Sequence, residues 1–302
     1  MDIKVVDFSG IRTAADITPA VIDQLHEAFT TIGFVIITNH GVEEKARTAF
    51  SVCRKFFDQP VEEKVKVQVT KETNTTGYGR VEQEKMRPDV GDLKEFFHIT
   101  DDSSTQVWPA NHAPFKTAMQ ELYSSMHQVA FIILECMARA LKLEDPLYFV
   151  KRHQLARDIK KNNGSMRVHN YPAVAPGTVK PGQLRCGEHI DFGSITLLFA
   201  DCPGGLQVKN SSGQYITVPH LPEAVQVNIG AVMQRWTADQ YIAPLHKVVV
   251  PDDGTQNDAR LSIPLFVHPD GDTLVECVDG SNKHPPILAR DEYAERCARV
   301  YF

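Results

Sequence analysis

The second half of the chain is divided into short segments that suit β-strands, with turn residues between them. From Gly164 onward, apolar and β-branched residues recur in runs of four to seven. Turn-forming sequences such as Pro203-Gly204-Gly205 fill the gaps. The segments that we expect to form strands are residues 166–171, 195–200, 206–209, 214–218, 225–229, 245–250, 261–267 and 273–278. Strands this short, punctuated by turns, are typical of a sandwich or a barrel.

The first half mixes helix-like and strand-like segments. Thr18 followed by Pro19 is typical of a helix N-terminus, and apolar residues at helical spacing then continue to Gly33. We expect further helices over residues 43–57, 115–141 and 288–300, strands over residues 3–8, 34–38 and 94–100, and a loop over residues 70–92. The predicted fold class is therefore α+β, with a mainly β core wrapped by N-terminal helices and a C-terminal helix.

Charge and hydropathy exclude several functions. The 32 basic and 38 acidic residues give a net charge of -6, so there is no basic surface for nucleic acid or for an anionic membrane. The apolar runs are strand-sized, which argues against a membrane span or a secretory signal. Six scattered cysteines without a CxxC pair are typical of reduced thiols. We expect a cytoplasmic protein, a monomer or weak homodimer, that acts on a small molecule.

A metal site is indicated by His189 and Asp191. Residues two apart in an extended segment project to the same face, so both side chains can bind one ion. A third ligand has to come from elsewhere, and His246, at the start of a later predicted strand, is the best candidate. Two histidines and one carboxylate suit non-heme Fe(II) and leave coordination positions open.

An open Fe(II) site needs an electron source for O₂, and a bidentate 2-oxo acid is one. Its distal carboxylate would need a cationic partner inside the barrel. Arg260 and Ser262 share one strand face and offer a guanidinium beside a hydroxyl. Tyr171, on the strand over residues 166–171, adds a phenol that can bind the same carboxylate.

These motifs occur in an order that resembles the isopenicillin N synthase-like Fe(II)/2-oxoglutarate-dependent dioxygenases. The resemblance covers about residues 3 to 270. Its segments are residues 33–42 (GFVIITNHGV), 94–95 (KE), 170–172 (NYP), 189–198 (HIDFGSITLL), 204–208 (GGLQV), 227–230 (VNIG), 236–237 (WT), 245–248 (LHKV) and 260–264 (RLSIP). The chain departs from the family at Ala231, Lys247 and residues 238–240, none of which is an expected metal ligand.

The resemblance implies a double-stranded β-helix, or jelly roll. It implies Fe(II) bound by His189, Asp191 and His246, and 2-oxoglutarate bound by Arg260, Ser262 and Tyr171. O₂ is the second co-substrate, and ascorbate is a candidate reductant. The expected regions are an N-terminal dioxygenase region (3–115), a scaffold helix and connection (116–160), the jelly-roll core (161–270) and a C-terminal strand and helix (271–302), together forming one structural unit.

Segments that form the substrate pocket in the family point to six residues here: Tyr78, Arg80, Phe96, His98, His169 and Leu184. Cys186 is expected to pack. The predicted function is oxidation, with hydroxylation as the leading outcome, of a small organic molecule, coupled to release of succinate and CO₂. One alternative is a family oxidase that does not use 2-oxoglutarate and binds a substrate carboxylate at Arg260 and Ser262. Another is a non-catalytic metal-bound binding module.

Overall fold

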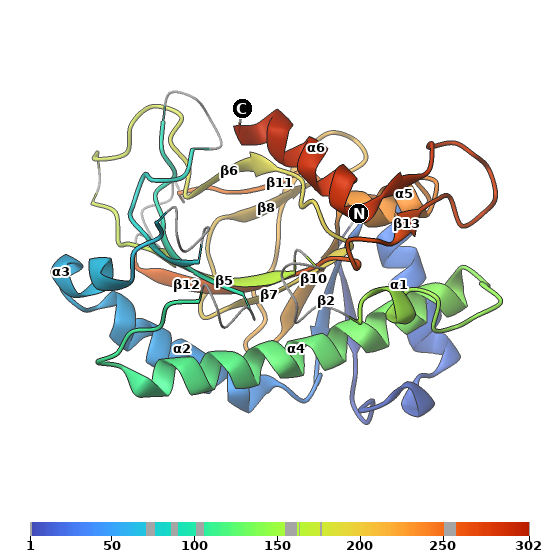
Figure 1. The fold of residues 1–302 in the computed structure, drawn as a ribbon, viewed down its shortest axis with the longest axis horizontal. Coiled ribbons are helices and arrows are strands. Elements are labelled where there is room, and N and C mark those ends of the chain that lie inside the picture. Colours follow the sequence, from blue (N-terminus) through green and yellow to red (C-terminus); the bar gives the residue numbers. More distant parts are fainter. Residues whose placement is uncertain are drawn as a thin grey trace.

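The computed structural model describes residues 2–70, 76–85, 90–100, 106–154, 162, 164–175, 177–250 and 258–301. Two sheets face each other across the middle of the molecule, and helices α2 (Glu43–Phe57) and α4 (Ala113–Ala140) run along the outer side of the larger sheet (Figure 1). The predicted α+β class with a jelly-roll core is confirmed.

The larger sheet has eight strands in the order β1-β2-β10-β7-β12-β5-β4-β3. Their bounds are β1 Lys4–Asp7, β2 Phe34–Thr38, β3 Gly77–Gly79, β4 Glu95–Ile99, β5 Ser165–Tyr171, β7 Ile195–Ala200, β10 Val225–Ile229 and β12 Arg260–Val267. Strands from the first 100 residues therefore flank both sides of strands from the second half. The N-terminal region completes the sheet rather than forming a sheet of its own, although the exact region boundaries stay a prediction.

The smaller sheet has four strands in the order β6-β11-β8-β9. Their bounds are β6 Cys186–His189, β8 Leu206–Lys209, β9 Tyr215–Thr217 and β11 His246–Val248. A buried cluster that includes Phe34, Ile36, Leu206, Val208 and Val248 draws side chains from both sheets. Because residues alternate between the two faces of a strand, this cluster fills the space between the sheets.

The bounds of the helices are α1 Pro19–Thr31, α2 Glu43–Phe57, α3 Val61–Lys64, α4 Ala113–Ala140, α5 Ala231–Trp236 and α6 Ala289–Tyr301, with short 3₁₀ helices at Ala14–Asp16, Val65–Val67 and Val150–Arg152. Helices α1, α2 and α4 pack together on the opposite face of the large sheet, whereas α6 lies on the side of the small sheet (Figure 1). As predicted, Thr18 caps α1, with its hydroxyl accepting a hydrogen bond from Val21 N at 3.4 Å. The long helix α4 buries residues such as Met119, Leu122 and Ile133 in the larger core cluster.

The structure differs from the sequence predictions at several elements, including the short helix α3, which was not predicted. The predicted loop over residues 70–92 contains the short strand β3, which pairs with β4. The predicted strand over residues 273–278 is reduced to β13 Leu274–Val275, paired with β14 Ile287–Leu288. The helix α5 was not predicted, because six residues are too few to show helical periodicity.

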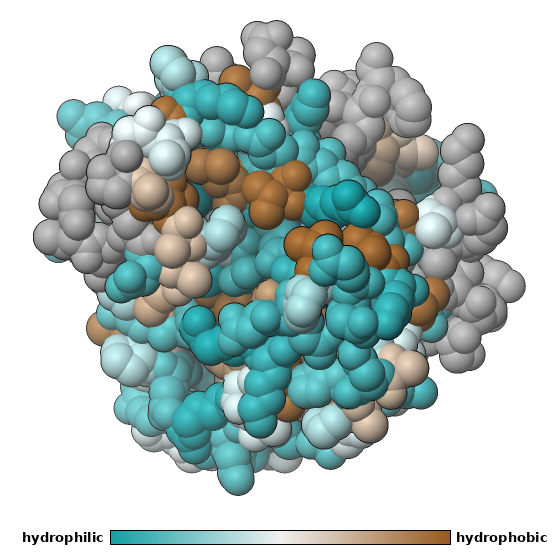
Figure 2. Space-filling view, turned by 90° about the vertical axis from the view of Figure 1, so that its left-hand side faces the viewer, coloured by the Kyte–Doolittle hydropathy of each residue, from teal (hydrophilic) through white to brown (hydrophobic). Residues whose placement is uncertain are grey.

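The surface offers scattered apolar residues rather than one apolar face. On the side of the molecule shown in Figure 2, hydrophilic residues predominate and the apolar ones form separate small patches. The large exposed apolar side chains of the described residues are Val5, Val61, Val81, Leu147 and Leu274. Single exposed apolar residues are normal on a globular protein. Among the helices that the structure describes, none has both the length and the apolar character to cross a membrane.

Candidate metal and co-substrate site

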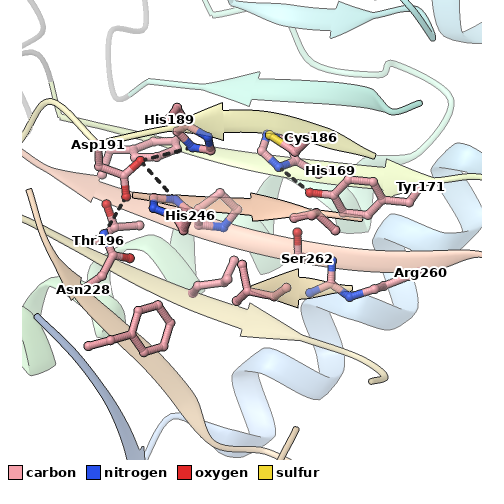
Figure 3. A pocket seen from close by; sticks show the side chains of 16 residues that line it. His169, Tyr171, Cys186, His189, Asp191, Thr196, Asn228, His246, Arg260 and Ser262 are labelled. Atoms are coloured by element: carbon pink, nitrogen blue, oxygen red, sulfur yellow. Dashed lines mark hydrogen bonds and ion pairs between the residues drawn. The ribbon is translucent and has the colours of Figure 1, made fainter. Parts of the chain in front are cut away.

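A cavity opens between the two sheets, and its wall carries all six residues predicted to bind metal and co-substrate. Three of them lie at one end and three at the other (Figure 3). Its lining is Phe34, His169, Tyr171, Cys186, His189, Asp191, Thr196, Leu198, Leu206, Asn228, His246, Val248, Arg260, Ser262, Pro264 and Phe266. We call this space the inner cavity.

His189, Asp191 and His246 converge at one end of the inner cavity. His189 ends β6 and His246 begins β11, and the two residues are paired across these antiparallel strands. Asp191 Oδ1 lies 3.6 Å from His189 Nε2 and 3.9 Å from His246 Nε2. One donor atom from each residue lies within 4.8 Å of the other two. Three donor atoms this close can share one metal ion.

Backbone carbonyls orient both imidazoles. His189 Nδ1 lies 2.8 Å from Gly187 O, and His246 Nδ1 lies 3.1 Å from Pro244 O. A carbonyl only accepts, so each Nδ1 carries the proton and each Nε2 presents its lone pair toward Asp191. Burial, and next the charge of His246, lower the pKa of His189 to about 4, which favours the neutral form that binds a metal.

Asp191 is held as a carboxylate. Burial acts to raise its pKa, but His246 and His189 more than offset this effect, and the net direction is downward. Asn228 Nδ2 donates to Asp191 Oδ2 at 2.8 Å, and the Thr196 hydroxyl also bonds to this carboxylate. The donor set and its supports therefore fit a divalent metal.

The sequence prediction missed the roles of Asn228 and Thr196. Both lie in segments that carry the family resemblance, and both strands point these residues into the cavity. Gly230 is a further sequence signal that Asn228 lies near Asp191. A Cβ at position 230 would lie 2.1 Å from Gly193 O, so only glycine fits there. The chain just after Asn228 must therefore approach the chain just after Asp191 closely, which the paired glycines permit.

Arg260, Ser262 and Tyr171 meet at the other end of the inner cavity. Arg260 and Tyr171 are paired across β12 and β5, and the Arg260 guanidinium lies 5.2 Å from the centre of the Tyr171 ring. Arg260 is 3% exposed, and its Nη1 has no hydrogen-bond partner in the described part of the chain. Burial raises the pKa of Tyr171, so the phenol stays protonated and can donate. A buried, incompletely bonded guanidinium beside two hydroxyls suits a carboxylate.

A second space adjoins the metal end, and we call it the outer cavity. It has a volume of about 120 Å³. His169, Cys186, His189 and Asp191 line both cavities. The further lining residues are Glu84, Lys94, His98, Ser165, Arg167, Ile190, Phe192, Phe266, His268 and Tyr293. A molecule in the outer cavity would thus lie next to the three metal-binding candidates.

Of the six residues predicted for the substrate pocket, His98 and His169 line the outer cavity. The other four line neither cavity. Tyr78 is buried and its hydroxyl donates to Glu95, and Phe96 lies beneath the Arg167 guanidinium at 5.0 Å. Arg80 is exposed, and the Leu184 carbonyl accepts from Leu93 N at 2.9 Å. The geometry does not support a substrate role for these four.

The sequence prediction also missed several residues of the outer cavity. Cys186 is buried, as expected of a packing residue, yet it lines both cavities and accepts a hydrogen bond from Lys94 Nζ at 3.3 Å. Glu84 and Tyr293 had no distinguishing sequence pattern. For Arg167 a signal existed, because it lies on the same strand face as His169 and Tyr171.

Two facing, mainly antiparallel sheets that hold a His-Asp-His set define a class of protein, the non-heme Fe(II) oxygenases of the double-stranded β-helix fold. Residues 3–126 match the family described as non-haem dioxygenase in morphine synthesis N-terminal, and residues 162–269 match the 2OG-Fe(II) oxygenase superfamily.

Individual proteins agree with the family match. The chain is 32% identical to the 2-oxoglutarate-Fe(II) type oxidoreductase ppzD of Metarhizium rileyi, over 83% of this chain and 76% of that protein. It is 30% identical to the proline hydroxylase buaE of Petromyces alliaceus, over 91% of this chain and 90% of that protein. A Neurospora crassa protein, solved at full length in complex with alpha-KG and thymine, superposes with a TM-score of 0.85 at 27% identity, covering 99% of this chain and 97% of that one.

The chain therefore belongs to the 2OG-Fe(II) oxygenase superfamily and is an Fe(II)- and 2-oxoglutarate-dependent oxygenase.

Proposed function

We propose that His189, Asp191 and His246 hold the Fe(II) of this oxygenase. The observation that carries the proposal is the convergence of two Nε2 lone pairs and one buried carboxylate within 4.8 Å. Fe(II) bound together with 2-oxoglutarate supplies the oxidising power, by coupling reduction of O₂ to decarboxylation of the keto acid to succinate and CO₂. The protein contributes neutral, oriented imidazoles and a carboxylate that Asn228 keeps in place.

Arg260 binds the distal carboxylate of 2-oxoglutarate in this proposal. Its guanidinium is buried at the end of the inner cavity opposite the triad (Figure 3). Ser262 and Tyr171 donate their hydroxyl protons to the same carboxylate. Leu198, Leu206 and Val248 also line the inner cavity, so the co-substrate would contact apolar side chains there that help to exclude water.

The outer cavity holds the substrate beside the metal, and hydroxylation of a small organic molecule is the proposed outcome. The small volume of this cavity supports a small substrate. The relatives that support hydroxylation by name are the proline hydroxylase of Petromyces alliaceus and a homoarginine-6-hydroxylase of Glycine max, which is 29% identical to this chain. The six cysteines are all free thiols, which supports a reducing, cytoplasmic location.

Two alternatives predict different results. An oxidase that does not use 2-oxoglutarate would consume O₂ without forming succinate, and a binding module would consume no O₂. We therefore expect purified protein with Fe(II), ascorbate and 2-oxoglutarate to form succinate in proportion to the O₂ consumed. The Arg290→Gln variant, changed at an exposed arginine, should behave like the wild type, and Asp191→Ala should form none. O₂ consumption without succinate would contradict the use of 2-oxoglutarate.

A further inference from the structure

We propose that the outer cavity selects an uncharged substrate that carries a carbonyl, such as a lactam or another cyclic amide, and that His98 donates a hydrogen bond to this carbonyl. This inference rests on the proposed function, because it requires that the outer cavity holds the substrate. The inference follows from the side chains that line the outer cavity. Its basic side chains are paired with acidic side chains of the protein, and a neutral hydrogen-bond donor, His98, is left to bind a ligand.

The first cation of the outer cavity, Arg167, is bonded within the protein. Its Nη1 pairs with the Glu84 carboxylate, and its Nε donates to His98 Nδ1 at 2.7 Å. Burial acts to raise the pKa of Glu84, but the charges of Arg167 and Lys94 hold that pKa far below its ordinary value. Glu84 is thus ionised and neutralises Arg167 directly.

The second cation, Lys94, is bonded in the same way. Its ammonium lies 2.8 Å from Asp92 Oδ2, 3.2 Å from Glu84 Oε2 and 3.3 Å from Cys186 Sγ. Asp92 Oδ1 in turn accepts from Gly187 N at 3.1 Å, so both oxygens of this carboxyl act as acceptors. Hydrogen bonds to Asp92 and Cys186 and an ion pair with Glu84 thus engage the ammonium within the protein, and its charge is already compensated by carboxylates before a ligand enters.

His98 is available as a hydrogen-bond donor to a ligand in the outer cavity. Arginine donates and never accepts, so His98 Nδ1 must be the acceptor in its bond with Arg167, and the ring proton must be on Nε2. Within the described part of the chain, this Nε2–H has no acceptor. Because His98 lines the outer cavity, a ligand can supply the acceptor. Arg167 therefore fixes His98 as a hydrogen-bond donor.

The remaining wall suits a flat, weakly polar molecule. Ile190, Phe192 and Phe266 supply apolar surface, and Tyr293 of α6 adds a further aromatic ring. His169 also lines this cavity, and its Nε2 is buried without a partner among the described residues. A carboxylate or ammonium on a ligand would lose its hydration here without meeting an unpaired opposite charge, which disfavours binding. A neutral carbonyl flanked by apolar atoms costs less to remove from water, and His98 can replace its lost hydrogen bond.

Matched six-membered rings test the inference. We would titrate 2-piperidone, pipecolate and piperidine, with thymine as a second uncharged probe, into the anaerobic protein loaded with Fe(II) and 2-oxoglutarate, and measure heat of binding. The uncharged probes should bind at least 10-fold more tightly than pipecolate and piperidine. Equal or tighter binding of either charged ring would overturn the inference, as would failure of both uncharged probes to bind.

Two variants add a result that a purely structural role would not give. In His98→Phe the donor is lost, and 2-piperidone affinity should fall about tenfold, whereas His98→Gln, which keeps an N–H donor, should lose less. In Glu84→Gln a cation loses its neutralising partner, so the preference should shift by at least tenfold toward pipecolate. Glu82→Gln, at an acidic residue that pairs with Lys180 and lines neither cavity, is the control.

An unchanged order of affinities in Glu84→Gln would contradict the inference. Failure of the proposed function is a separate observation, because it would appear as absence of 2-oxoglutarate binding before any probe is added. The order of affinities in the wild type decides the inference even where a variant fails to fold.

Discussion

His189 and His246 face each other as cross-strand partners of β6 and β11, with their ring centres 4.2 Å apart. Hydrogen bonding between the two strands therefore fixes the distance between two of the three candidate ligands. Asp191 follows β6 by two residues and is held by Asn228 from the opposite sheet. The site thus depends on both sheets, which explains why no short segment of this chain could form it alone.

Replacing Asn228 by alanine should weaken Fe(II) binding while leaving all three ligands in place. Asn228 Nδ2 donates to Asp191 Oδ2 at 2.8 Å, and losing such a support typically costs roughly 10–100-fold in metal affinity. Anaerobic Fe(II) titration followed by calorimetry measures the effect. Asn282→Ala, at an exposed position, should bind as the wild type does. An unaltered affinity in Asn228→Ala would mean that Asp191 needs no support.

Addition of 2-oxoglutarate should stabilise the folded protein through Arg260. A ligand at 100 times its Kd stabilises the folded state by about 2.7 kcal/mol. In Arg260→Gln the buried partner of the distal carboxylate is lost, so the rise in Tm at the same concentration should largely disappear. Thermal unfolding with and without 2-oxoglutarate measures this, with Arg290→Gln as a matched control. The same rise in both variants would place the carboxylate elsewhere.

Replacing Glu95 by alanine should strongly destabilise the fold without touching either cavity. Lys64 and Glu95 form an ion pair at 2.9 Å, each 5% exposed, and the Tyr78 hydroxyl also donates to Glu95. Removing one partner of a buried pair leaves an uncompensated charge and costs about 3–5 kcal/mol. Urea unfolding measures the loss. Glu63→Ala, which breaks the more exposed pair with Lys66, should cost less than about 1 kcal/mol.

Acid should destabilise the protein partly through His153. Its Nδ1 donates to Phe149 O at 2.7 Å, so its Nε2 accepts from the Ser194 hydroxyl at 2.9 Å. Burial lowers the pKa of His153 to about 4. An unfolded histidine has a pKa of about 6.5, so this stabilisation is complete above about pH 6.5 and is lost as the pH falls toward 4.

The difference between these two pKa values corresponds to roughly 3 kcal/mol. Urea unfolding at pH 7.5 and at pH 4.5 should therefore show a smaller loss of stability in His153→Asn than in the wild type. His26→Gln is the control, because His26 lies near the surface in α1. An equal loss in His153→Asn and the wild type would assign the acid sensitivity to other groups.

Much of the architecture and of the inner cavity follows from local sequence patterns. The alternation of strand residues puts Arg260 and Ser262 on one face, and turn sequences separate the strands that the structure contains. Two ligands on one short segment, His189 and Asp191, are visible from spacing alone. His246 was a candidate from its place at the start of a later predicted strand, and the resemblance to known proteins supported that choice.

The outer cavity could not be predicted in the same way. Lys94, Arg167 and Glu84 come from three separate segments, and each has an ordinary surface interpretation when viewed alone. Only the pairing of β4 with β5, which aligns His98 with Arg167, brings them together. Tyr78 and Phe96 were placed in the substrate pocket by analogy, but Tyr78 packs in the larger core cluster. Phe96 lies on the same face of β4 as His98, yet it packs against Arg167 and lines neither cavity. Side-chain direction at a sheet edge depends on register, which the sequence does not specify.

The anaerobic absorption spectrum tests the central claim most directly. A charge-transfer band should appear in the visible range when 2-oxoglutarate is added to the Fe(II)-loaded wild type. The same band should be absent in Asp191→Ala and should require a higher 2-oxoglutarate concentration in Arg260→Gln. A band of equal intensity in Asp191→Ala, at the same 2-oxoglutarate concentration as in the wild type, would contradict the assignment of this metal site.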